Sequence, residues 1–176
     1  MRQSLLIARL APLGLLCSRA AGAFTGLGGP TMEPYCARAC RTVLGSATLP
    51  CSMVHDDHNQ GHGHGAMAMT SPDCYASDDA FLTSLAYCFK VNCPNLPLWQ
   101  LEQYWADAAT GVPAVPPKWS YQTALDHVNG TPSAEYTAPD TLNSTMLVPH
   151  MAYHTWSRFM PVLDYNSAKM YIYSCV

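Results

Sequence analysis

Apolar residues recur three or four positions apart in several stretches of the chain, which is the spacing of one face of a helix. These stretches are residues 33–45, 78–88, 98–109 and 120–130. Pro34 suits the first turn of the first helix, and Ser77 is placed to cap the second, which opens with two aspartates. The pattern predicts a small domain that is mainly α-helical.

The C-terminal part of the chain has a weaker pattern. Residues 142–148 fit an extended segment, and residues 150–159 fit another helix that runs into an irregular tail. His150 and His154 would lie one turn apart on this helix and could hold a metal. Because Pro149 starts the segment and no carboxylate lies between them, we favour the alternative, a surface or interface pair. We expect all four tryptophans to be core anchors.

Residues 53–69 interrupt the helical pattern. The segment is rich in glycine and holds six candidate metal ligands, His55, His58, His62, His64, Met67 and Met69. Glycine raises backbone entropy, and the segment has no apolar period to bury, so the sequence predicts a flexible surface loop.

The side chains of this loop suit copper or iron. Imidazole binds borderline cations, methionine sulfur favours Cu(I), and neighbouring Asp56 and Asp57 add attraction for a cation. Ordering a glycine-rich segment costs backbone entropy, so we predict modest affinity. The alternative is a solvated spacer between Cys51 and Cys74.

Composition narrows the class of protein. The 176 residues fit one domain, 49% are hydrophobic and 12% charged, and the formal charge is -3. With no cluster of lysine or arginine, the chain has no cationic surface for a nucleic acid. Residues 1–23 have the order of a secretory signal peptide, and its removal would leave residues 24–176 with 6 basic and 12 acidic residues.

Cysteine usage agrees with export. Cys17 would leave with the signal, and Cys175 has no evident partner. The six that remain are Cys36, Cys40, Cys51, Cys74, Cys88 and Cys93. They predict three disulfides with 15 possible pairings, and the absence of a CxxC pair argues against a zinc ribbon. Asn129 and Asn143 begin N-glycosylation sequons.

Common catalytic motifs are absent from the sequence: it has no GxSxG, HExxH, GxGxxG or phosphate-binding glycine loop. The histidine loop and the pair His150 and His154 are therefore the candidate sites.

Several blocks of the chain resemble the outer N-terminal region of fungal ferric reductase transmembrane components. The blocks are residues 35–41 (YCARACR), 49–52 (LPCS), the histidine loop, 74–88 (CYASDDAFLTSLAYC), 101–105 and 117–125. The resemblance covers roughly residues 33–160. It implies a plasma-membrane protein that passes electrons from cytosolic NADPH through FAD and two haems to extracellular ferric or cupric ions.

The haem, FAD and NADPH sites of that family have no counterpart in these 176 residues, and neither do its apolar spans, so we do not carry redox catalysis over to this chain. We expect its partners to be metal ions or metal chelates, with a membrane reached only through a further C-terminal domain. One hypothesis is the outer part of a ferric reductase, truncated before the membrane. The alternative is a secreted metal-binding or cysteine-rich interaction protein.

Among the possible pairings we favour one. Cys36 and Cys40 lie one helical turn apart, so a bond between them would constrain almost nothing, and each should reach a different element. We predict that Cys51 and Cys74 close the histidine loop, and that Cys36 and Cys40 are tied to the region of Cys88 and Cys93.

Overall fold

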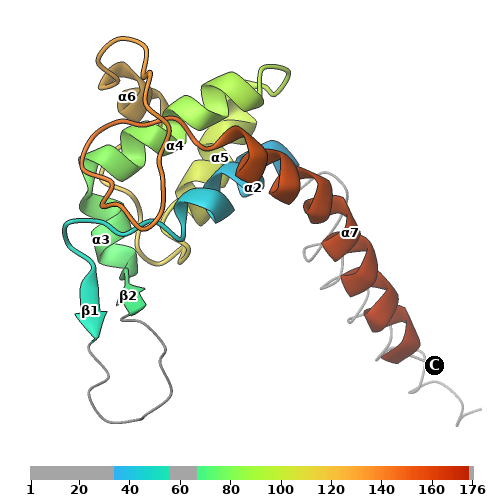
Figure 1. Cartoon of the computed structure of the whole chain (residues 1–176). Coiled ribbons are helices and arrows are strands. Elements are labelled where there is room, and N and C mark those ends of the chain that lie inside the picture. The colour runs from blue at the N-terminus through green and yellow to red at the C-terminus, as the bar shows by residue number, and fades with distance from the viewer. Residues whose placement is uncertain (1–33, 56–66, 175–176) are drawn as a thin grey trace, which may run out of the picture.

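The computed structural model describes residues 34–55 and 67–174, which form a mainly helical domain with a small antiparallel hairpin (Figure 1). The proposed signal peptide, residues 1–23, lies outside the described residues. The helices are α2 (Tyr35–Leu44), α3 (Pro72–Ser77), α4 (Asp79–Asn92), α5 (Leu98–Ala108), α6 (Tyr121–Asp126) and α7 (His150–Ser174). The strands are β1 (Met53–His55) and β2 (Met67–Met69). The predicted fold class, a disulfide-stapled helical domain, is confirmed.

Helix α4 forms the centre of the domain because it is apolar on most of its surface. Nine of its fourteen residues are buried, and α2, α3 and α6 pack against it. Phe89 is fully buried and contacts three aromatic rings, with centroid distances of 5.8 Å to Trp105 and Tyr121 and 5.9 Å to Tyr104. These contacts join α4 to α5 and α6, whose predicted positions are confirmed to within a few residues.

The start of α4 differs from the prediction. Ser77 is the last residue of α3, a short helix that the sequence reading missed, and its hydroxyl donates to Asp73 O at 2.8 Å. The cap of α4 is Asp78, whose Oδ1 accepts from the Phe81 N–H at 2.7 Å. A carboxylate at this position satisfies a free N–H and also faces the positive end of the helix dipole.

The tryptophan prediction is right for one residue and wrong for two. Trp105 is buried, and its Nε1 donates to Trp119 O at 2.7 Å. Trp99 is 67% exposed and Trp156 is 39% exposed. Spacing identified the helix that carries Trp99 but did not show which face of that helix meets α4.

Three disulfides tie these elements together. Cys36–Cys93 and Cys40–Cys88 connect α2 to the last turns of α4, with Cα–Cα distances of 5.7 and 6.0 Å. Cys51–Cys74 links the segment before β1 to α3, with a Cα–Cα distance of 5.8 Å. The predicted pairing is confirmed. The bridges are consistent with an extracellular location, since thiols stay reduced in the cytosol.

Arg41 joins α2 to the end of α5. Its Nε donates to Ala109 O at 2.6 Å, and its guanidinium carbon lies 4.5 Å from the centre of the Tyr75 ring. Burial lowers the pKa of this guanidinium, and the hydroxyls of Tyr75 and Tyr104 act against that shift. A Cβ at Gly45 would lie 2.9 Å from the backbone Arg41 O and would also meet the Arg41 guanidinium, so glycine is favoured there.

The segment between α6 and α7 has little regular structure but is held at several points. Leu142 is fully buried, and its N–H donates to Thr48 O at 2.8 Å. Tyr136 N–H donates to Leu147 O at 2.9 Å. In and beside the predicted extended segment, residues 142–148, the strand pairing is limited to two isolated bridges, Thr48 with Thr141 and Glu135 with Leu147.

The predicted irregular C-terminal tail is wrong, because α7 continues to Ser174. The predicted helix covers residues 150–159 and thus ends before Pro161. A proline inside a helix removes one backbone hydrogen bond and adds a clash, at a cost of about 3 kcal/mol, which destabilises the helix without always ending it. Helix α7 packs against α2, and Met160, next to the proline, is buried.

Candidate functional site

The ends of the histidine loop are not irregular: they form the β1–β2 hairpin. Its register pairs Met53 with Met69, Val54 with Ala68 and His55 with Met67. Alternate positions of a strand share one face, and residues directly opposite each other across two strands lie on the same face. The register therefore brings Met53 directly opposite Met69, and both are exposed at the foot of the hairpin, with the backbone of His55 opposite that of Met67.

The foot of this hairpin is tied to the domain by several bonds. Besides Cys51–Cys74, the hydroxyl oxygens of Ser52 and Thr70 lie 2.6 Å apart, which joins the two strand ends. Leu49 N–H donates to Ser52 Oγ at 2.8 Å, and this connects the hairpin to the buried segment after α2. A base held in this way reduces the chain entropy that must be lost when the strands bind a common ligand.

The structure describes only some of the predicted metal ligands. His58, His62 and His64 lie outside the described residues, while His55 and Met67 are placed by their backbone register. Met53 and Met69 are 60% and 62% exposed. Within residues 34–55 and 67–174, no three His, Cys, Asp or Glu side chains form a group able to hold a metal ion.

Met53 is the residue that the sequence reading left out of its ligand set. It lies fourteen residues before Met67 in the chain, and only the strand pairing brings it opposite Met69. A sequence signal for the hairpin does exist. Candidate ligands occur at every second residue both before the loop, at Met53 and His55, and after it, at Met67 and Met69, and a spacing of two residues is typical of strands.

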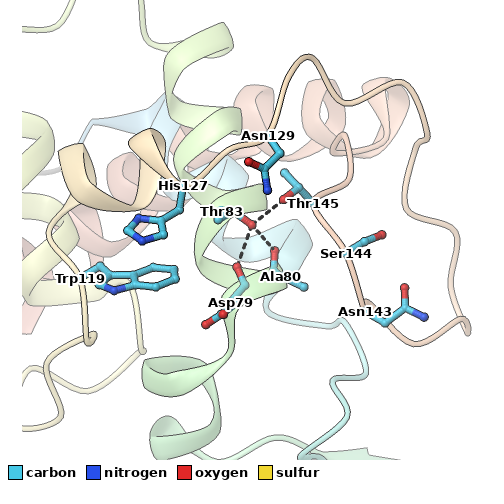
Figure 2. Close-up of a pocket in the computed structure, with 9 residues that line it drawn as sticks. All are labelled: Asp79, Ala80, Thr83, Trp119, His127, Asn129, Asn143, Ser144 and Thr145. Atoms are coloured by element: carbon cyan, nitrogen blue, oxygen red, sulfur yellow. Dashed lines mark hydrogen bonds between the residues drawn. The ribbon is translucent and has the colours of Figure 1, made fainter.

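A polar pocket of about 450 Å³ lies at the start of α4, and both predicted glycosylation asparagines, Asn129 and Asn143, line it (Figure 2). Thr83 closes one side: its Oγ1 donates to Asp79 O at 2.7 Å and lies 2.8 Å from Thr145 Oγ1. The two sequons, fourteen residues apart in the chain, therefore line one pocket, where attached glycans would be neighbours.

The opposite side of this pocket is aromatic and charged. The rings of Trp119 and His127 stack at 4.1 Å, and His127 Nδ1 donates to Thr123 O at 2.8 Å. Lys118 forms an ion pair with Asp79 and also lies over the Trp119 ring. These side chains mainly bond one another, so the pocket is a polar surface depression that brings together no nucleophile and base.

Beside the pocket, Asp78 has a shifted acidity. Partial burial raises the pKa of its carboxyl, while the hydrogen bond from the Phe81 N–H acts in the opposite direction. Asp78 and Asp79 were predicted to be helix-start charges, and their positions at the N-terminus of α4 agree with that.

The comparisons with known proteins give no match, whether to family models, to curated proteins or to solved structures. Among the helices in the described part of the chain, none is both long enough and apolar enough to span a membrane.

Proposed function

We propose that this chain is the outer-surface domain of a ferric-chelate or cupric reductase-like protein, which gathers iron or copper ions and presents them for reduction. The observation that supports this best is the β1–β2 register, which pairs Met53 with Met69 and His55 with Met67 at the two ends of the histidine-rich segment. The resemblance in residues 74–88 supplies the context of metal reduction.

The chemistry of these residues favours copper. Thioether sulfur is a soft ligand that selects Cu(I), whereas imidazole binds Cu(II) as well as other borderline cations. Met53 and Met69, both exposed, are available to a Cu(I) ion, and His58, His62 and His64 in the loop would add imidazoles. A site with both ligand types can hold copper before and after reduction. The metal ion is the cargo of the domain, which has no catalytic role by itself.

The proposal includes a location. Residues 1–23 would direct the chain into the secretory pathway, where the three disulfides form. The haem, FAD and NADPH that carry electrons in the family would belong to a membrane domain encoded outside these 176 residues. That arrangement would be supported if the reading frame continued beyond the Val176 codon and encoded several apolar spans of about 20 residues.

Metal titration of the secreted full-length product tests the hairpin. Met53→Leu with Met69→Leu keeps side-chain size but removes two of the three hairpin sulfurs, so we expect Cu(I) affinity to fall at least tenfold. Met151→Leu is the matched control, because Met151 is 76% exposed on α7, away from the hairpin. Unchanged Cu(I) affinity in the double variant would remove Met53 and Met69 from the proposal.

The histidines are tested with Cu(II) and Fe(III). Replacing His55, His58, His62 and His64 together by glutamine should weaken binding of both ions. In the unaltered chain binding should also weaken below about pH 6, because histidine has an ordinary pKa of about 6.5 and a protonated imidazole cannot bind metal. Equal affinity of the two chains for both ions would argue against the loop.

A second candidate function is an extracellular interaction protein, and one observation favours it. Helix α7 exposes several large apolar side chains, namely Met151, Trp156, Phe159, Val162 and Leu163. Exposed apolar residues gathered on one element are typical of contact surfaces. This function predicts no response to transition metals, so the same titrations distinguish the two.

A further inference from the structure

Helix α7 opens with two histidines whose rings meet. His150 and His154 are one turn apart, and their Nε2 atoms are 2.8 Å from each other. The ring centroids are separated by 4.1 Å at an interplanar angle of 71°. Both residues are exposed, so burial does not account for the arrangement.

The Nε2 atoms share a single hydrogen bond, in which one ring donates and the other accepts. The lone pair of the accepting nitrogen therefore points at the proton of the other ring. For one metal ion to bind both nitrogens, the shared proton leaves and the rings turn slightly, so that both lone pairs point to one position beside the Nε2–Nε2 line. The one-turn spacing and the short distance between the nitrogens put such a position within reach of both imidazoles.

The Nε2–Nε2 distance needs the least change for a metal ion whose two nitrogen ligands lie at a right angle. Two nitrogen ligands at about 2.0–2.1 Å from one metal lie about 2.9 Å apart at a right angle and about 3.3 Å apart at the tetrahedral angle. The observed 2.8 Å is nearest to the right-angle value. Square-planar or tetragonal geometry is typical of Cu(II) and Ni(II), whereas zinc prefers a tetrahedron.

We propose that His150 and His154 form a two-imidazole site for a divalent transition ion, with Cu(II) preferred. Within the part of the chain that the structure describes, no third His, Cys, Asp or Glu joins the pair. The remaining positions are taken by water or by a ligand that arrives with the ion. A site with open positions exchanges its metal readily, which suits capture and release.

The backbone around the pair makes the site preorganised. Tyr153, between the two histidines, packs against the hydrophobic core, and its N–H donates to Pro149 O at 2.9 Å. The first turn of α7 is thereby fixed to the domain, so little chain entropy is lost when the metal binds. The positive end of the helix dipole lies at the same turn and opposes a cation, which keeps the affinity moderate.

This site is separate from the hairpin of the proposed function. Figure 1 shows α7 beginning on a different side of the domain from β1 and β2. The exposure of His150 and His154 agrees with their interpretation as a surface pair, and the proposal adds metal binding to that role.

Copper binding by a chain without loop histidines tests the inference. The background carries His55→Gln, His58→Gln, His62→Gln and His64→Gln, and Cu(II) is followed by calorimetry and by electron paramagnetic resonance. We expect one Cu(II) bound through two nitrogens, with affinity in the order Cu(II), Ni(II), Zn(II). Adding His150→Gln or His154→Gln should each weaken Cu(II) binding at least tenfold.

His127→Gln is the matched control, because His127 is also exposed but its ring bonds a backbone carbonyl and stacks on Trp119. Its removal should leave Cu(II) affinity unchanged. The inference is overturned if either variant of the pair binds as the background does, or if the signal shows one nitrogen. Because the background lacks the loop histidines, failure here leaves the hairpin titrations unaffected, and failure of the hairpin leaves this result unaffected.

Discussion

The domain centre and the β1–β2 hairpin differ in how their residues are positioned. Around α4, Cys40 and Phe89 are fully buried, and each is held by neighbours from other helices. In the hairpin, Met53 and Met69 are largely exposed, and their relative position comes from strand register and from a disulfide at the foot. Burial organises the first region, and covalent and backbone constraints organise the second.

The difference shows where this fold leaves residues available for binding. A side chain whose position depends on packing is covered by the neighbours that position it. A side chain placed by register needs no cover and can face a ligand. The pair His150 and His154 belongs to the second type, since helix spacing alone brings the rings together.

The largest expected effect comes from the two bridges between α2 and α4. The Cys40–Cys88 bridge lies inside the loop that Cys36–Cys93 closes. Either bridge alone therefore still closes most of this loop in the unfolded chain, and only the removal of both opens it. Replacing Cys36, Cys40, Cys88 and Cys93 by alanine should lower the free energy of unfolding by about 6 kcal/mol, from loop-closure entropy. Urea unfolding measures it, and a loss of folding is the natural result for a small domain.

Cys51→Ala with Cys74→Ala is the comparison for that variant. Its loop is shorter, with a sequence separation of 23, so we expect a loss of about 3 kcal/mol. The domain should stay folded while Cu(I) binding at the hairpin weakens. If this variant unfolds as completely as the fourfold one, the hairpin is not separable from the domain centre.

Two aromatic residues on neighbouring helices sharpen the contrast between buried and exposed positions. Phe89→Ala should destabilise the protein by about 3–5 kcal/mol, because it removes buried contacts to three rings and leaves a cavity. Trp99→Ala, at a 67% exposed position on α5, should change the free energy of unfolding by less than about 0.5 kcal/mol. Equal losses, measured by urea unfolding, would contradict the central role of α4.

Asp78 offers a smaller effect with a pH signature. Asp78→Ala removes the cap of α4 and should cost about 1 kcal/mol, whereas Asp78→Asn retains a cap. Since burial raises the pKa of Asp78, the folded protein holds this proton more tightly than the unfolded chain. The contribution of Asp78 to stability is therefore greatest below the ordinary pKa of aspartate and falls as pH rises through the raised value.

The asparagine variant cannot lose that proton. Relative to the unaltered protein, Asp78→Asn should thus become more stable as pH rises from about 3.5 to 7, in unfolding experiments at each pH. A difference that does not change with pH would show that Asp78 has no raised pKa.

The smallest effect is expected at Tyr136. Its ring is buried in the core, but its hydroxyl is buried without a hydrogen-bond partner among the described residues. Tyr136→Phe removes an unsatisfied polar group and keeps the ring, so stability should be unchanged or rise by up to about 1 kcal/mol. A clear loss of melting temperature would reveal a partner for this hydroxyl.

The sequence by itself determined the helices α2, α4, α5 and α6 and the three-disulfide framework, because helix periodicity, capping residues and cysteine number are local or countable properties. Tertiary structure decided what depends on distant segments meeting. Glu102 is an example, because its two carboxylate oxygens accept hydrogen bonds from the N–H groups of Tyr121 and Gln122. The spacing of residues in the sequence does not predict this contact.

The same reason explains what was missed at the candidate sites. The histidine loop was identified from composition, but the pairing of Met53 with Met69 required two strands to meet in register. The spacing of His150 and His154 was visible in the sequence, while the 2.8 Å contact required that both residues lie on the first turns of α7. Residue types come from the chain, and their distances come from packing.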